Sequence, residues 1–119
     1  MTIASGHLCT WPRNPLLQDS KRRPVVVLSE TFPGRATALV VPLTSDLSGA
    51  LLPVRVPIEA TPATGLERPS LALCDQITCL LLSLLSNPFG RVEDDLLQRL
   101  RRSGALALGL QPSDLRDGG

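Results

Sequence analysis

The sequence predicts a mainly β (α+β) fold in which five or six short strands close into a small barrel and one C-terminal helix packs against it. Residues 25–28 and 38–41 are runs of β-branched and aliphatic residues without polar alternation, typical of strands buried on both faces. Only residues 92–108 carry apolar residues at helical spacing. Because 43% of the 119 residues are hydrophobic and only 3% are aromatic, we expect one domain with an aliphatic core.

The first 22 residues are predicted to form a strand and a loop. Residues 6–11 form the strand, which Pro12 ends because it has no N–H to donate to a ladder. Residues 13–22 contain the breaker pair Asn14-Pro15, so we expect a surface loop there.

An arginine and a proline stand at the start of the first buried strand. Pro24 has a fixed φ and no N–H, which suits the first residue of a strand. Arg23 is therefore a long cation held at the end of a rigid element, where its guanidinium can be aimed. The next strand, residues 37–41, leads into Thr44 and Ser45. Both strands pass from an apolar core into a polar tip.

The central part of the chain is predicted to form further strands separated by loops rich in proline and glycine. Residues 52–58 place valine and isoleucine on one face, and their two prolines indicate an edge strand. Residues 70–85 are predicted as extended chain with Asp75 and Gln76 in mid-strand. Turns or loops are expected at residues 33–34, 46–49, 60–69 and 87–90.

The predicted helix spans residues 92–108. Acidic residues occupy its first turn and arginines follow, the order that the helix dipole favours. Ser103-Gly104 is expected to fray it. The polar tail, residues 111–119, is expected to be mobile.

Charge and cysteine content exclude several classes. A net charge of +1 and a pI near 7.8 give no strong electrostatic footprint for duplex nucleic acid. Three cysteines without a CxxC pair, and one histidine, argue against a disulfide framework or a zinc site. The N-terminus lacks the features of a signal peptide, and the longest apolar stretch, residues 77–85, is too short to span a bilayer. We therefore expect a cytoplasmic protein that does not enter the membrane.

Several short sequence motifs occur in a familiar order and at compatible distances along the chain. They are Gly6, Arg23-Pro24-Val25-Val26-Val27, Val40-Val41-Pro42-Leu43-Thr44-Ser45, Gly65-Leu66, Ser70, Cys74-Asp75-Gln76-Ile77 and Phe89-Gly90-Arg91-Val92. From about residue 23 to residue 110 the chain resembles the MazF/PemK family of toxin endoribonucleases. We accordingly divide the single expected domain, residues 1–119, into a family-like core at 23–110, a divergent segment at 1–22 and the tail.

The resemblance implies a fold, an activity and partners. The fold is an SH3-like β-barrel, here of five to seven short strands, that forms a homodimer and binds a cognate MazE-like antitoxin. The activity is sequence-selective cleavage of single-stranded RNA, chiefly mRNA, without metal or other cofactor, leaving 2′,3′-cyclic phosphate and 5′-hydroxyl ends. Arg23 matches the catalytic arginine, Thr44 the catalytic threonine or serine, and Asp75 an acidic position implicated in some members.

The chain departs from the family before Arg23. Most members carry a Gly-Ser-Glu-like loop about five residues before the arginine, and this loop borders the RNA groove. Here Gln18 or Asp19 stands in for the glutamate. Gln18 and Asp19, together with Lys21, Arg22, Ser45, Asp75 and Gln76, are the candidate RNA-binding or auxiliary residues.

Each candidate also has a purely structural interpretation. Arg23 would be one solvated arginine of a basic run, Thr44 a turn or helix cap, and Asp75 an ion-pair partner of Arg55 or Arg91. His7 is interpreted as structural, the cysteines as core residues, and Trp11 as core or interface rather than as a platform for a base.

Two rival functions remain open at this point. One is a CcdB-like gyrase poison of the same fold, although residues 111–119 lack the Trp-Gly-Ile ending typical of that class. The other is a non-catalytic module that only binds antitoxin. The RNA sequence that would be cleaved and the identity of the general base do not follow from the sequence.

Overall fold

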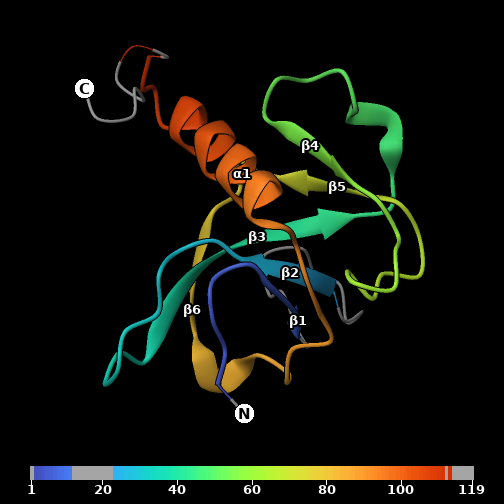
Figure 1. The fold of residues 1–119 in the computed structure, drawn as a ribbon. Coiled ribbons are helices and arrows are strands. Elements are labelled where there is room, and N and C mark those ends of the chain that lie inside the picture. The colour runs from blue at the N-terminus through green and yellow to red at the C-terminus, as the bar shows by residue number, and fades with distance from the viewer. Residues whose placement is uncertain (1, 12–22, 112, 114–119) are drawn as a thin grey trace.

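The computed structural model describes residues 2–11, 23–111 and 113, and its centre is a curled, seven-stranded antiparallel sheet with one helix on one side (Figure 1). The sheet order is β4-β5-β3-β2-β1-β7, and β6 pairs with β3 away from this path. The strands are β1 (His7–Trp11), β2 (Arg23–Val27), β3 (Thr37–Thr44), β4 (Arg55–Ile58), β5 (Ser70–Leu73), β6 (Thr78–Leu81) and β7 (Gly90–Arg91), and the helix is α1 (Asp94–Ala107). The predicted fold class is confirmed, with the sheet forming a half-barrel.

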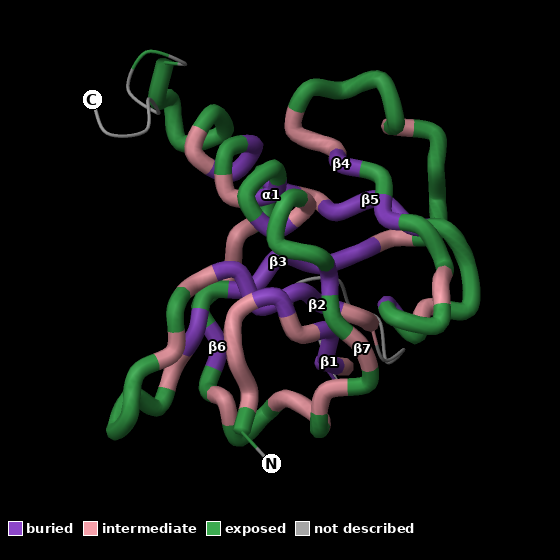
Figure 2. Tube along the Cα trace, viewed as in Figure 1, coloured by how far each residue is buried: buried purple, intermediate pink, exposed green. Residues whose placement is uncertain are grey.

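Strand β2 is buried on both faces, as the missing polar alternation predicted (Figure 2). The same prediction for residues 38–41 of β3 is wrong at Leu39, which is 44% exposed. Val25, Val26 and Val27 of β2 are all fully buried. Val26 belongs to the cluster that packs beneath α1, whereas Val25 and Val27 belong to a second cluster with Trp11. Successive side chains of a strand point to opposite faces, so a single run of valines serves both clusters.

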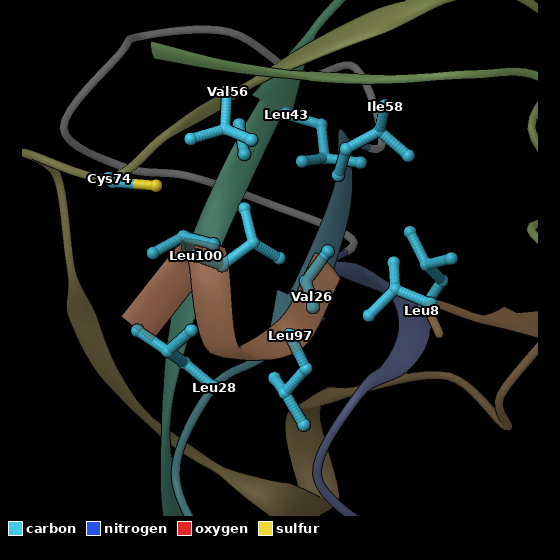
Figure 3. Packing of buried hydrophobic residues seen from close by; sticks show 12 residues of the cluster. Leu8, Val26, Leu28, Leu43, Val56, Ile58, Cys74, Leu97 and Leu100 are labelled. Carbon is cyan, nitrogen blue, oxygen red and sulfur yellow. The ribbon is translucent and has the colours of Figure 1, made fainter. Parts of the chain in front are cut away.

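Helix α1 closes the first cluster (Figure 3). Leu97 and Leu100 project from α1 onto the sheet and are buried there with aliphatic side chains of the central strands. The predicted fraying at Ser103-Gly104 is wrong: both residues lie inside α1 and are buried. A Cβ on Gly104 would lie 3.0 Å from Cδ1 of Ile77, so glycine lets the helix approach the chain after β5 closely.

Three strand predictions need correction. β3 does not end before Pro42 but runs on to Thr44. Residues 37–40 of β3 pair with β6, and residues 43–44 pair with β5 on the same side of the strand. Pro42 lies where the pairing partner changes from β6 to β5, so the hydrogen bond that its missing N–H cannot make costs little. β4 begins only at Arg55, and it is an edge strand as predicted.

The third correction concerns the segment after β5. Asp75 and Gln76 are not in mid-strand: they lie in a tight turn between β5 and β6, where the N–H of Gln76 donates to the carbonyl of Leu73 at 2.9 Å. Gly90, which was expected in a turn, belongs to β7.

Several predictions fall outside the described residues. These are the loop at residues 13–22 and nearly all of the tail. In the part of the chain that the structure describes, no helix is long and apolar enough to cross a bilayer.

Candidate functional site

The sheet topology brings Arg23 and Thr44 to the same end of the sheet, where β2 begins and β3 ends. β2 and β3 are antiparallel with Val25 opposite Pro42, so continuing this register by two residues leads to Arg23 on β2 and Thr44 on β3. β5 starts at the same edge, since Thr44 pairs with Leu71. β2 therefore begins where β3 ends, so Arg23 and Thr44, the polar residues predicted at the two strand ends, lie at the same end of the sheet.

An open cleft of about 770 Å³ lies at this edge. Arg23, Thr44 and Ser45, three of the predicted site residues, line it together. Its walls also contain apolar, hydroxyl and charged residues from three other parts of the chain. The remaining lining residues are Thr10, Pro24, Leu43, Asp46, Leu66, Glu67, Arg68, Ser70 and Phe89.

The Thr44 hydroxyl is held by the turn that follows β3. Its oxygen accepts a hydrogen bond from the N–H of Asp46 at 3.1 Å, so the structural interpretation of Thr44 as a turn residue is correct. This bond uses the oxygen as an acceptor and leaves the hydroxyl proton available to a ligand in the cleft. The turn therefore orients the hydroxyl that the resemblance marks as catalytic.

Asp46 places a fixed negative charge at the rim of the cleft. Its carboxylate accepts the N–H of Ser48 at 3.0 Å and caps the short helix η2 (Leu47–Gly49). Hydrogen bonds from the backbone and the side chain of Ser48 lower the pKa of Asp46 below its ordinary value. Asp46 is therefore ionised at neutral pH and is not a proton donor there.

The ends of β2 and β3 form one wall of the cleft, and the loop between β4 and β5 forms a second wall. The buried hydroxyl of Thr64 organises this loop: it donates to the carbonyl of Glu59 at 2.9 Å and accepts the N–H of Thr61 at 3.0 Å. The loop rests on β7 so closely that a Cβ on Gly90 would overlap the carbonyl oxygen of Thr64. These contacts position Glu67 and Arg68 at the cleft.

Sequence reasoning missed this second wall. Residues 60–69 were interpreted as a connecting loop from their prolines and glycine, and Phe89 as part of a turn. Leu66, Ser70 and Phe89 occur among the motifs that carry the resemblance, and Glu67-Arg68 is an adjacent acid–base pair between a glycine and a proline. Nothing in the local pattern places that pair beside Arg23.

Asp75 and Gln76 do not line the cleft. The Asp75 carboxylate forms an ion pair with Arg55 at 2.7 Å, one of the two structural partners considered for it. This pair ties the β5–β6 turn to the start of β4. The candidates Gln18, Asp19, Lys21 and Arg22 lie outside the described residues.

Most of the other reactive side chains occupy structural positions, but Cys79, which was interpreted as a core residue, is exposed on β6. Nδ1 of His7 accepts the N–H of Ala4 at 2.9 Å, and Trp11 is buried in the second cluster. Burial raises the pKa of the Cys9 thiol to about 11, and burial together with the charge of Asp75 raises that of Cys74 to about 11. Within residues 2–11, 23–111 and 113, no group of three or more His, Cys, Asp or Glu residues is arranged to hold a metal ion.

Comparison with known proteins supports the resemblance independently. A sequence profile of the PemK-like, MazF-like toxins of type II toxin-antitoxin systems matches residues 8–108. The "Probable endoribonuclease MazF" of Mycolicibacterium smegmatis is 37% identical over 92 residues, which cover 76% of this chain and 83% of that protein.

Solved structures agree with this assignment at the level of the fold. MazF from Deinococcus radiodurans superposes with a TM-score of 0.75 at 22% identity, over 92% of this chain and 99% of that one. The MazE-MazF structure from the same organism gives a TM-score of 0.74 at 23% identity, over 93% and 100% of the two chains. Profile, relative and fold therefore coincide, and the chain belongs to the PemK/MazF family of toxins of type II toxin-antitoxin systems.

Proposed function

We propose that this chain is a metal-independent, sequence-selective endoribonuclease toxin that cleaves single-stranded RNA, chiefly mRNA, to 2′,3′-cyclic phosphate and 5′-hydroxyl ends. The observation that carries the proposal is the meeting of Arg23 and Thr44 at one open cleft. The relative named a probable endoribonuclease and the family assignment support the same activity.

The proposed chemistry needs stabilisation of the negative charge that accumulates on the phosphorane. The guanidinium of Arg23 suits this task, because its planar fork donates two hydrogen bonds to phosphate oxygens and never loses its charge. The hydroxyl of Thr44, already oriented by the N–H of Asp46, donates a further hydrogen bond to the same phosphate. The attacking 2′-hydroxyl is supplied by the RNA itself: its oxygen bonds to phosphorus while the bond to the 5′-oxygen breaks. The proton that the 2′-hydroxyl loses is balanced by one that the leaving 5′-oxygen gains, so the products are a cyclic phosphate and a 5′-hydroxyl.

The proposal includes two partners and a compartment. A toxin that cuts message must be restrained, and we propose a cognate MazE-like antitoxin whose C-terminal segment covers the cleft. MazE and MazF of Deinococcus radiodurans occur together in solved structures, which supports an antitoxin partner. We further propose that the chain forms a homodimer and acts in the cytoplasm, where its substrate is found.

The direct test is to incubate purified protein with total RNA in EDTA and to sequence the cleaved ends. The proposal predicts cuts within single-stranded stretches, with 2′,3′-cyclic phosphate on one side and 5′-hydroxyl on the other. Loss of cleavage in EDTA would contradict the proposed metal independence. Intact RNA together with tight binding of antitoxin would favour a non-catalytic binding module instead.

A further inference from the structure

Part of the cleft lining combines one aromatic ring with two charges of opposite sign. Phe89, Glu67 and Arg68 all line the cleft, and Phe89 is 39% exposed. Neither the Glu67 carboxylate nor the Arg68 guanidinium has a hydrogen-bond or ion-pair partner among the described residues. These groups are therefore available to a ligand in the cleft.

The position of Phe89 is fixed by its backbone and by a glycine. Its N–H donates to the carbonyl of Leu8 at 2.9 Å. A Cβ on Gly65, which has φ +69°, would lie 3.0 Å from Cδ1 of Phe89 and 2.5 Å from its carbonyl oxygen, so the ring and its backbone rest directly on the glycine. A base that stacks on this ring meets a platform that is ordered before the RNA arrives.

The two charged residues specify which base would stack there. A carboxylate accepts two hydrogen bonds, and guanine alone presents two adjacent donors, N1–H and the N2 amino group, on its Watson–Crick edge. A guanidinium donates two, and guanine presents the acceptors O6 and N7 on its other edge. Uracil and cytosine lack this combination, and adenine offers a single donor group beside one acceptor.

We propose that Phe89, Glu67 and Arg68 form a guanine-selecting subsite, in which the base stacks on Phe89 while Glu67 reads its N1 and N2 donors and Arg68 reads O6 and N7. This inference deepens the proposed endoribonuclease function and rests on it for the statement that the ligand is RNA. It assigns sequence selection to the β4–β5 loop and the chain before β7.

The experiment measures equilibrium binding of short 2′-O-methyl oligouridines that carry one variable base and that resist cleavage by attack of the 2′-oxygen. Wild-type protein should bind the guanine oligonucleotide about 10-fold more tightly than the inosine one, which lacks the N2 amino group. Glu67→Gln should abolish that difference. Arg68→Ala should abolish the preference for guanine over 7-deazaguanine, which lacks N7, and Phe89→Leu should weaken binding of every oligonucleotide by about 10-fold.

Matched control variants lie outside the cleft. Phe32→Leu removes an exposed ring elsewhere, and Glu59→Gln neutralises an exposed carboxylate that does not line the cleft, so both should bind like wild type. Glu67 is exposed, so its variant should stay folded, and thermal melts would check each protein.

Failure of this inference is distinguishable from failure of the proposed function. Wild-type protein that cleaves RNA but binds guanine and inosine oligonucleotides equally would overturn the subsite and leave the nuclease intact. Guanine preference that depends on Glu67, in a protein that leaves RNA uncut, would uphold the subsite and refute the nuclease. Variants that lose antitoxin affinity but keep every oligonucleotide affinity would show that this part of the cleft lining binds protein instead.

Discussion

The hydroxyl of Thr44 combines a structural role with a proposed chemical one. Its oxygen accepts the N–H of Asp46, which leaves the proton to donate. Thr44→Ser keeps this arrangement and should stay active, whereas Thr44→Val keeps the shape, loses the donor and should cut RNA about 100-fold more slowly. Single-turnover cleavage of a defined oligonucleotide measures both. Full activity of a folded Thr44→Val protein would show that the hydroxyl serves only the turn.

Arg23 is predicted to tolerate substitution less well than Thr44. Arg23→Ala should slow cleavage by about 100-fold or more, and Arg23→Lys should recover little because a point charge cannot reproduce the bidentate fork. Since both residues act on one phosphate, the double variant with Thr44→Val should cost less than the sum of the single costs. Strict additivity of the two free-energy losses would contradict a shared transition state.

The three cysteines should differ in reactivity. At pH 8 a thiol reagent should label one thiol per native chain, the exposed Cys79, while Cys9 and Cys74 react only in denaturant. Both buried thiols have pKa values raised from 9.0 to about 11, so the native state holds more protons than the unfolded state between about pH 9 and 11. The free energy of unfolding should therefore fall as pH rises through that window. Native Cys79→Ser protein that still reacts at pH 8 would contradict this assignment.

At the scale of elements, the contact between the β4–β5 loop and β7 depends on a missing side chain. Gly90→Ala should destabilise the protein by about 1–3 kcal/mol, because its Cβ would overlap the backbone of Thr64. Gly49→Ala is the matched control: its Cβ would meet nothing closer than 3.7 Å, so it should change stability by less than about 0.5 kcal/mol. Urea denaturation compares the two, and equal stability would mean that the loop shifts freely.

At the scale of the whole molecule, we predict a dimer. The strands leave more aliphatic surface than a single helix covers, and several large apolar side chains of the described chain are exposed. On β3, β6 and the short helix η3 (Leu82–Leu84) these are Leu39, Leu81 and Leu84. Sedimentation at micromolar concentration should give about twice the chain mass of 12.7 kDa. A single species at the chain mass would refute the dimer.

The amino-acid pattern was sufficient for the elements whose periodicity is local. The valine runs predicted strands buried on both faces, and the helical spacing after Val92 predicted α1, because each signal depends on neighbours within a few residues. The same local signals failed where a longer contact decided the outcome. Gly104 stays helical because Ile77 packs against it, and β3 continues through Pro42 because its edge changes partner there.

The candidate site divides in the same way. Arg23 and Thr44 could be identified from sequence because each ends an apolar strand, and a shared sheet edge follows from pairing those strands. The part of the cleft formed by Glu67 and Phe89 could not be identified from the local pattern. These two residues are 22 positions apart in the chain, and both lie far along it from Arg23. Their approach depends on Gly65 and Gly90 letting one backbone rest on another. Periodicity and polarity are local properties of a chain, whereas contact between distant loops is set by sheet register and packing, which only the folded protein reveals.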